Sequence, residues 1–103
     1  MTGKELAEVT GGKILCGDPE RSLSGCYIGD LLSLAMSRVQ SDNVWITIQS
    51  NINIVAVASL TDAGCIVICD GFSPDEDALE KAKDEDILII TSEKSAYDIA
   101  KLI

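Results

Sequence analysis

The sequence predicts an α/β fold, a single three-layer domain with a mainly parallel β-sheet flanked by helices. Short runs rich in apolar and β-branched residues alternate with segments of about ten residues in which apolar positions recur at helical spacing. One of the runs, Cys65–Cys69, is apolar at every position, as in parallel strands that are covered on both faces. The chain has 103 residues, 47% of them hydrophobic, which suffices to bury one core and leaves no room for a second domain.

The first half of the chain is predicted to hold two helices and three strands. Thr2 and Glu5 form a capping-box pattern that opens a helix, which continues to about Thr10 and stops at Gly11-Gly12. Asp30 is positioned to cap a second helix that ends near Val39. The expected strands, which are separated by turns rich in Gly, Asp and Asn, are Lys13–Cys16, Gly25–Ile28 and Val44–Ile48.

Helices and strands alternate regularly in the second half. The run Ile52–Leu60 predicts a helix that ends at Gly64, and Ser73-Pro74 stand in the order that starts another helix. That next helix has a narrow apolar stripe formed by Ala78, Leu79 and Ala82. The remaining expected elements are strands at Cys65–Cys69 and Ile87–Ile90 and a final helix with Ala96, Ile99, Ala100 and Ile103 on its apolar face.

The predicted helix Ile52–Leu60 is apolar almost all round, so it must be covered on most sides. The cover comes either from other parts of this domain or from a second copy of the chain, and the sequence leaves both alternatives open. A homodimer would use the small and apolar side chains of this helix. The candidate interface residues are Ile52, Val55, Ala56, Ala58 and Ser59.

The charge balance excludes some classes of partner. The net charge is −9, which disfavours nucleic acid, because a phosphate backbone would be repelled. Much of the negative excess lies between Asp70 and Asp86, where we expect a solvated helix face. No segment approaches the roughly 18 apolar residues of a membrane span, and the first residues carry no long apolar stretch. We therefore expect a cytoplasmic protein without a membrane partner.

The four cysteines lack the spacing of a metal site. They form no C-x-x-C pair, and the chain has no histidine to complete a mixed site. Cys65 and Cys69 fall on one predicted strand, where they would be roughly 13 Å apart and too distant for a disulfide bond. We interpret all four as small buried hydrophobes, and the remaining two are Cys16 and Cys26.

Polar residues follow the predicted strands at their carboxyl ends, which is where open α/β sheets bind ligands. Gln49 and Asn53 stand out, since Gln is not a favoured cap and Asn53 interrupts an apolar helix start. A buried amide there needs a partner from a ligand, a neighbouring subunit or the domain itself. The candidate ligand-binding residues are Asp30, Gln49, Ser50, Asn51, Asn53, Asp70, Gly71, Thr91 and Ser92.

Catalytic patterns are missing from the sequence. It contains neither G-x-x-x-x-G-K-[ST] nor G-x-G-x-x-G, and without histidine it lacks the commonest general base. The chief carboxylates at strand exits are Asp30 and Asp70, and such a pair could do acid–base work or hold a magnesium ion. We predict no catalytic residues, no metal and no cofactor.

The chain resembles the DRTGG domain, a module similar to the N-terminal, non-kinase domain of bacterial HPr kinase. The resemblance is carried by Gly25–Ser33, Val44–Gln49, Asn51–Ala58 and Gly71–Asp75. It covers nearly the whole length, so we expect one DRTGG-like domain over residues 1–103. The stretch that matches the family's naming motif reads Arg21-Ser22-Leu23-Ser24-Gly25 and departs from it.

This resemblance implies an α/β fold, frequent dimerisation and a regulatory or assembly role, because such domains are often fused to CBS pairs, phosphotransacetylase-like enzymes and pyrophosphatases. The first hypothesis is a stand-alone, non-catalytic regulatory module that senses a small polar metabolite or a nucleotide at the strand exits. The alternative is a protein-interaction subunit for dimerisation or assembly that binds no ligand. A small carboxylate enzyme is the least favoured hypothesis.

Overall fold

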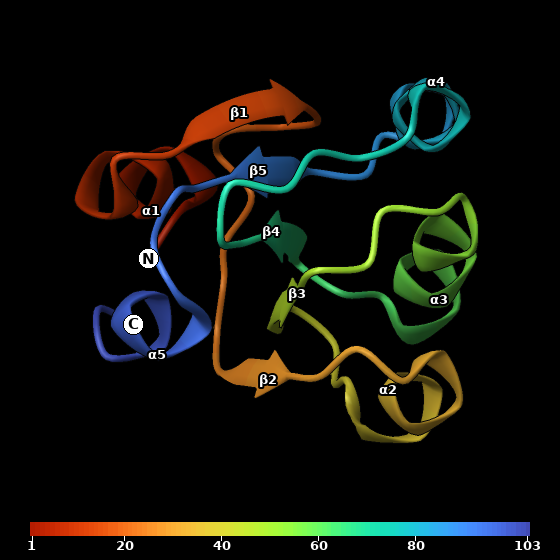
Figure 1. Cartoon of the computed structure of the whole chain (residues 1–103), viewed down its shortest axis with the longest axis horizontal. Helices are drawn as coiled ribbons and strands as arrows, with labels where there is room; N and C mark the ends of the chain where they lie inside the picture. The colour runs from red at the N-terminus through yellow and green to blue at the C-terminus, as the bar shows by residue number, and fades with distance from the viewer.

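The computed structural model describes residues 1–103 and contains one five-stranded sheet in the order β1-β5-β4-β3-β2 (Figure 1). Its strands are β1 (Lys13–Cys16), β2 (Cys26–Ile28), β3 (Val44–Thr47), β4 (Cys65–Ile68) and β5 (Ile89–Thr91). Strands β2 to β5 run parallel, and β1 pairs antiparallel with β5. The predicted mainly parallel sheet is confirmed, and the two short N-terminal strands form its opposite edges.

Helices cover both faces of the sheet, which confirms the three-layer prediction. Helices α2 (Leu32–Arg38), α3 (Asn53–Thr61) and α4 (Glu76–Asp84) lie on one face, and α1 (Gly3–Thr10) and α5 (Ala96–Ala100) on the other (Figure 1). The chain is apolar along β3 and β4 because successive residues point to opposite faces and both faces are buried. Trp45 and Ile66 pack with α2, α3 and α4, while Ile46 and Val67 pack under α1 and α5.

Most elements differ from the prediction by one to three residues at an end, and three boundaries have a specific structural reason. Helix α3 ends at Asp62, which adopts a left-handed conformation, and not at Gly64. Gly64 instead allows close packing, since a Cβ there would lie 2.5 Å from the Asp42 carbonyl oxygen. Helix α4 begins after Asp75, so Ser73 does not cap it. Strand β5 begins later than expected, because the Ile87 N–H still donates to the Ala82 carbonyl at the end of α4.

The structure confirms some local predictions and corrects others. Thr2 and Glu5 form the predicted reciprocal capping box. Helix α4 buries only Ala78 and Ala82, as expected of a solvated acidic helix.

The four cysteines are free thiols, but only Cys65 and Cys69 are buried; the others are Cys16, which is half-buried, and Cys26, which is exposed. The prediction that Cys26 is buried is wrong, because Cys26 begins the edge strand β2. No helix has both the length and the apolar character needed to cross a membrane.

Candidate functional site

The carboxyl ends of β2 and β3 are joined by a chain of hydrogen bonds. Asp30 Oδ1 accepts from the Thr47 hydroxyl at 2.8 Å and from the Ile48 N–H at 2.9 Å. The Gln49 side-chain amide donates to the Asp30 carbonyl at 2.9 Å, and the Asn51 amide donates to Gln49 Oε1 at 3.1 Å. The structure therefore brings together three predicted site residues, Asp30, Gln49 and Asn51, and uses them to brace one another.

This arrangement corrects two sequence-based predictions. Asp30 does not cap α2, whose cap position is Leu31, because its carboxylate faces the end of β3. Asn53 is exposed, so its amide is not a buried group in need of a partner; its backbone N–H donates to Asn51 Oδ1 at 2.9 Å. Ser50 contributes its carbonyl, which accepts from the Asp75 N–H at 2.8 Å. The polar groups at the carboxyl ends of β2 and β3 are therefore bonded to one another.

The carboxyl ends of β4 and β5, unlike those of β2 and β3, border a cavity. A cavity of about 210 Å³ lies there and contains three of the predicted residues, Gly71, Thr91 and Ser92. The other residues that line it are Gly11, Lys13, Phe72, Ser73 and Glu93. The sequence did not indicate Lys13, because the pairing of its edge strand was not predictable, or Phe72, although an aromatic residue directly after Gly71 was a usable signal.

The cavity combines one cation, one anion and an aromatic ring. Lys13 is exposed, and Phe72 keeps 51% of its surface exposed. Ser92 is buried, and its hydroxyl donates to the Thr10 carbonyl at 3.1 Å while accepting from the Lys94 N–H at 3.2 Å. Gly71 has a left-handed φ of 77°, and a Cβ there would lie 2.6 Å from Glu93 Oε2. The glycine therefore keeps room for the Glu93 carboxylate at this cavity.

Asp70, the remaining predicted residue, lies beside a buried thiol. The Cys69 Sγ–H donates to Asp70 Oδ2 at 3.6 Å. Burial and the neighbouring Asp70 charge raise the pKa of the Cys69 thiol to about 11, so the thiol is protonated at neutral pH and is not a nucleophile. No group of three or more carboxylate or thiol side chains is arranged to hold a metal ion.

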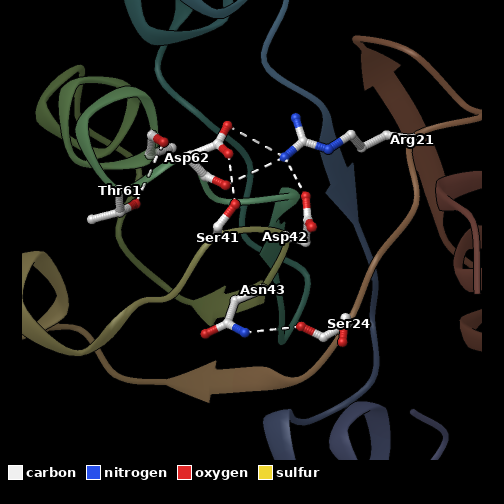
Figure 2. Close-up of polar contacts among 8 residues, drawn as sticks. Arg21, Ser24, Ser41, Asp42, Asn43, Thr61 and Asp62 are labelled. Atoms are coloured by element: carbon white, nitrogen blue, oxygen red, sulfur yellow. Dashed lines mark hydrogen bonds and ion pairs between the residues drawn. The ribbon is translucent and has the colours of Figure 1, made fainter.

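A different polar cluster lies at the amino-terminal end of the sheet (Figure 2). One Arg21 nitrogen, Nη2, contacts Asp42 Oδ1 at 2.8 Å and Asp62 Oδ1 at 3.4 Å. The Ser41 hydroxyl donates to Asp62 Oδ2 at 2.6 Å. The Asn43 amide donates to the Ser24 carbonyl at 2.9 Å. These contacts attach the β1–β2 connection to the loops that precede β3 and β4.

The charges of this cluster stabilise one another. Burial opposes the Arg21 charge, but the bond to Asp42 and the nearby Asp62 outweigh it and raise the pKa of the guanidinium. The Ser41 hydroxyl and the Arg21 charge lower the pKa of the Asp62 carboxyl. Arg21 begins the stretch that corresponds to the DRTGG motif. Its side chain bonds to the Asp42 carboxylate and to the carboxylate and carbonyl of Asp62.

A family model for the DRTGG domain matches residues 5–103. The chain belongs to the DRTGG domain family. Among solved structures, this DRTGG domain is similar to the CBS and DRTGG domains of the regulatory region of a Clostridium perfringens pyrophosphatase, complexed with its activator diadenosine tetraphosphate. The TM-score is 0.82 at 13% sequence identity, and the match covers 98% of this chain and 45% of that chain. No curated protein sequence matches this DRTGG domain.

Some of the predicted dimer residues of α3 are buried within the domain, and the others are exposed. Val55 and Ala58 are fully buried against the domain's own sheet, so they are unavailable to a second copy. Ile52, Ala56 and Ser59 are exposed. Leu60, which was not among the predicted contacts, is the most exposed apolar residue of this DRTGG domain, at 75%. The helix is thus covered on one side by the domain itself, while a second side remains in solvent.

Proposed function

We propose that this DRTGG domain is a non-catalytic regulatory module that binds a small polar ligand in the cavity at the carboxyl ends of β4 and β5. One observation carries the proposal: the cavity unites the predicted residues Gly71, Thr91 and Ser92 with a lysine and an exposed aromatic ring. The ends of parallel strands are the usual ligand position in such sheets. The nucleotide activator of the similar pyrophosphatase region also supports a regulatory role.

Lys13 and Phe72 favour a ligand with an anionic group and a flat ring, against the repulsion of the Glu93 carboxylate that also lines the cavity. The Lys13 ammonium offers a positive charge within a protein of net charge −9, and the Phe72 ring offers a face for stacking. The cavity volume of about 210 Å³ is below the roughly 300–1,000 Å³ of sites for drug-sized ligands. We therefore expect a mononucleotide or a small phosphorylated metabolite, since a dinucleoside tetraphosphate is too large to be enclosed.

Asp30 and Asp70, the two carboxylates predicted to suit acid–base work, do not line the cavity, and this supports binding without catalysis. Asp30, one of the two carboxylates considered for acid–base work, is held by the Thr47 hydroxyl and the Ile48 N–H. The nearby Cys69 thiol has a pKa of about 11. A ligand in this cavity would instead join segments from β1, β5 and the loop after β4, and such cross-linking is suited to changing stability or assembly.

A thermal-shift screen of mononucleotides and phosphorylated metabolites tests the proposal. At a concentration of about 100 times Kd, a ligand should stabilise the folded domain by roughly 2.7 kcal/mol. Lys13→Ala and Phe72→Ala should each remove the shift. Lys4→Ala and Tyr97→Ala alter exposed residues outside the cavity and serve as matched controls. A flat response across the panel, or a shift that survives both cavity variants, would reject this site.

Homodimerisation through α3 stays a prediction. Only Ile52, Ala56 and Ser59 of the predicted contacts are available, and two chains of net charge −9 repel each other at close range. Sedimentation of the domain at micromolar concentration measures its mass directly. A monomer would leave the exposed side of α3 free for another partner.

A further inference from the structure

Helix α3 carries a second apolar stripe that this domain does not cover. Ile52, just before the helix, and Ala56, Ser59 and Leu60 within it are exposed at the spacing i, i+4, i+7 and i+8, which places them along one side. Together with the exposed polar Asn53 they line a groove of about 420 Å³ between α3 and α4, whose other wall carries Lys81 and Glu85.

This groove continues into a second cavity, of about 300 Å³, at the amino-terminal end of the sheet. Ser59 and Glu85 line both cavities, so the two are adjacent. The second cavity is acidic, with carboxylates from Asp18, Asp62, Glu85 and Asp86.

The available cations do not neutralise this end of the groove. Arg21 is already bound to Asp42 and Asp62, and Lys81 pairs with Glu85 at 3.3 Å. Two carboxylates remain without an ion pair, those of Asp18 and Asp86. The groove therefore combines the apolar Ile52, Ala56 and Leu60 with two polar residues along α3, and it is negatively charged at one end.

We propose that the α3–α4 groove is the docking site for an amphipathic helix of a partner protein, with an apolar face along α3 and Lys or Arg at the end that meets the carboxylates. A groove between two packed helices accepts the side-chain ridge of a third helix. The nine residues of α3 span roughly 13 Å, which matches about two and a half turns of a partner helix. The unpaired carboxylates select a basic end.

Charge complementarity favours this partner over a second copy of the chain. A second copy brings a net charge of −9 and its own acidic helix ends, so self-docking would place carboxylates near carboxylates. The single lysine in the groove is paired with Glu85 and does not offset this repulsion. A basic helix meets no such penalty.

Two fluorescein-labelled helical peptides with the same leucine pattern provide the test. One carries lysines in its terminal turn and the other glutamates, and fluorescence anisotropy measures their binding to the whole domain at low salt. The lysine peptide should bind, and Leu60→Glu should weaken it about tenfold or more by placing a charge in the apolar contact. Tyr97→Glu, on the opposite face of the sheet, should leave the affinity unchanged.

A second variant isolates the charge contribution. Asp18→Asn and Asp86→Asn together remove both unpaired carboxylates; Asn still accepts the bond that Asp18 receives from Glu20 and tolerates the left-handed φ of Asp86. This double variant should weaken the lysine peptide about tenfold and lose its salt dependence. Equal binding of the glutamate peptide, no binding of either peptide, or indifference to Leu60→Glu would each overturn the proposal. A dimer split by Leu60→Glu would instead assign the groove to a second copy.

Discussion

The two ends of the sheet are both lined by polar side chains, but different interactions hold them. At the carboxyl ends of β2 and β3, Asp30 binds the Thr47 hydroxyl and a backbone N–H, and Thr47 is only 1% exposed. At the amino ends, Arg21 joins Asp42 and Asp62 by charge, and these side chains are 33% to 69% exposed (Figure 2). The first cluster satisfies the hydroxyl of a buried threonine, whereas the ion pairs of the second are screened by water and salt.

A second contrast lies within the carboxyl ends themselves. The exit of β2 and β3 is filled by its own side chains, while the exit of β4 and β5 leaves a cavity of about 210 Å³. Both exits carry the polar residues that favour ligand binding in parallel sheets. The difference teaches that polar residues at a strand end indicate a site only where they do not bond to each other.

Replacement of Asp30 should have the largest effect on stability. Asp30→Ala leaves the buried Thr47 hydroxyl and the Ile48 N–H without an acceptor, so the free energy of unfolding should fall by about 1–3 kcal/mol. Asp30→Asn keeps an Oδ1 acceptor and should retain most of the stability. Urea denaturation followed by circular dichroism measures both variants.

Asn53→Ala is the matched control for the Asp30 variants. The Asn53 side chain is exposed and makes no hydrogen bond, so its removal should change the free energy of unfolding by no more than about 0.5 kcal/mol. If Asp30→Ala and Asn53→Ala had the same effect, the interpretation of the β2–β3 exit as a structural brace would be wrong.

The sequence predicted the fold well because its information is local. Apolar periodicity and turn residues indicated all five strands and all five helices, with errors of a few residues at element ends. The site was predicted less well, since it depends on pairing between distant segments. Lys13 reaches the cavity because β1 pairs antiparallel with β5, and no pattern in the sequence specified that pairing.

Burial was the other quantity that sequence reasoning missed. The apolar composition of α3 does not say which side faces the sheet, so Val55 and Ala58 were assigned to an interface although they belong to the core. Asn53 was assigned to a buried position for the same reason, and it lies on the exposed side. Helical periodicity separates two sides only when one of them is polar, and on this helix both are apolar.

The buried thiol at the β4 exit should make the domain sensitive to high pH. Burial and Asp70 raise the pKa of Cys69 from 9.0 to about 11, so the folded state keeps its proton over a range in which the unfolded state loses it. The stabilisation is therefore fully present below pH 9 and is lost as the pH rises towards 11. Urea denaturation across this range should show a falling free energy of unfolding, and the slope should be shallower in Cys69→Ala. An unchanged slope would contradict the prediction.

Apart from the Asn53 control, the smallest effect is expected at the opposite end of the sheet, for Arg21. Arg21→Met keeps the aliphatic stem and removes the charge, so it should lower the free energy of unfolding by only about 0.5–1 kcal/mol, because the ion pairs are partly exposed. A double-mutant cycle with Asp42→Asn, a residue that tolerates the left-handed φ of 67°, measures the coupling between the two charges.

The dependence of these stability effects on salt concentration tests whether the Arg21 cluster and the β2–β3 exit are held by different kinds of interaction. The coupling between Arg21 and Asp42 should decline as ionic strength rises, since the Debye length falls to about 3 Å at 1 M salt. The loss in Asp30→Ala should be nearly independent of salt, because it arises from a buried hydroxyl and an N–H without an acceptor. If both effects responded equally to salt, the two ends of the sheet would be held by the same kind of interaction.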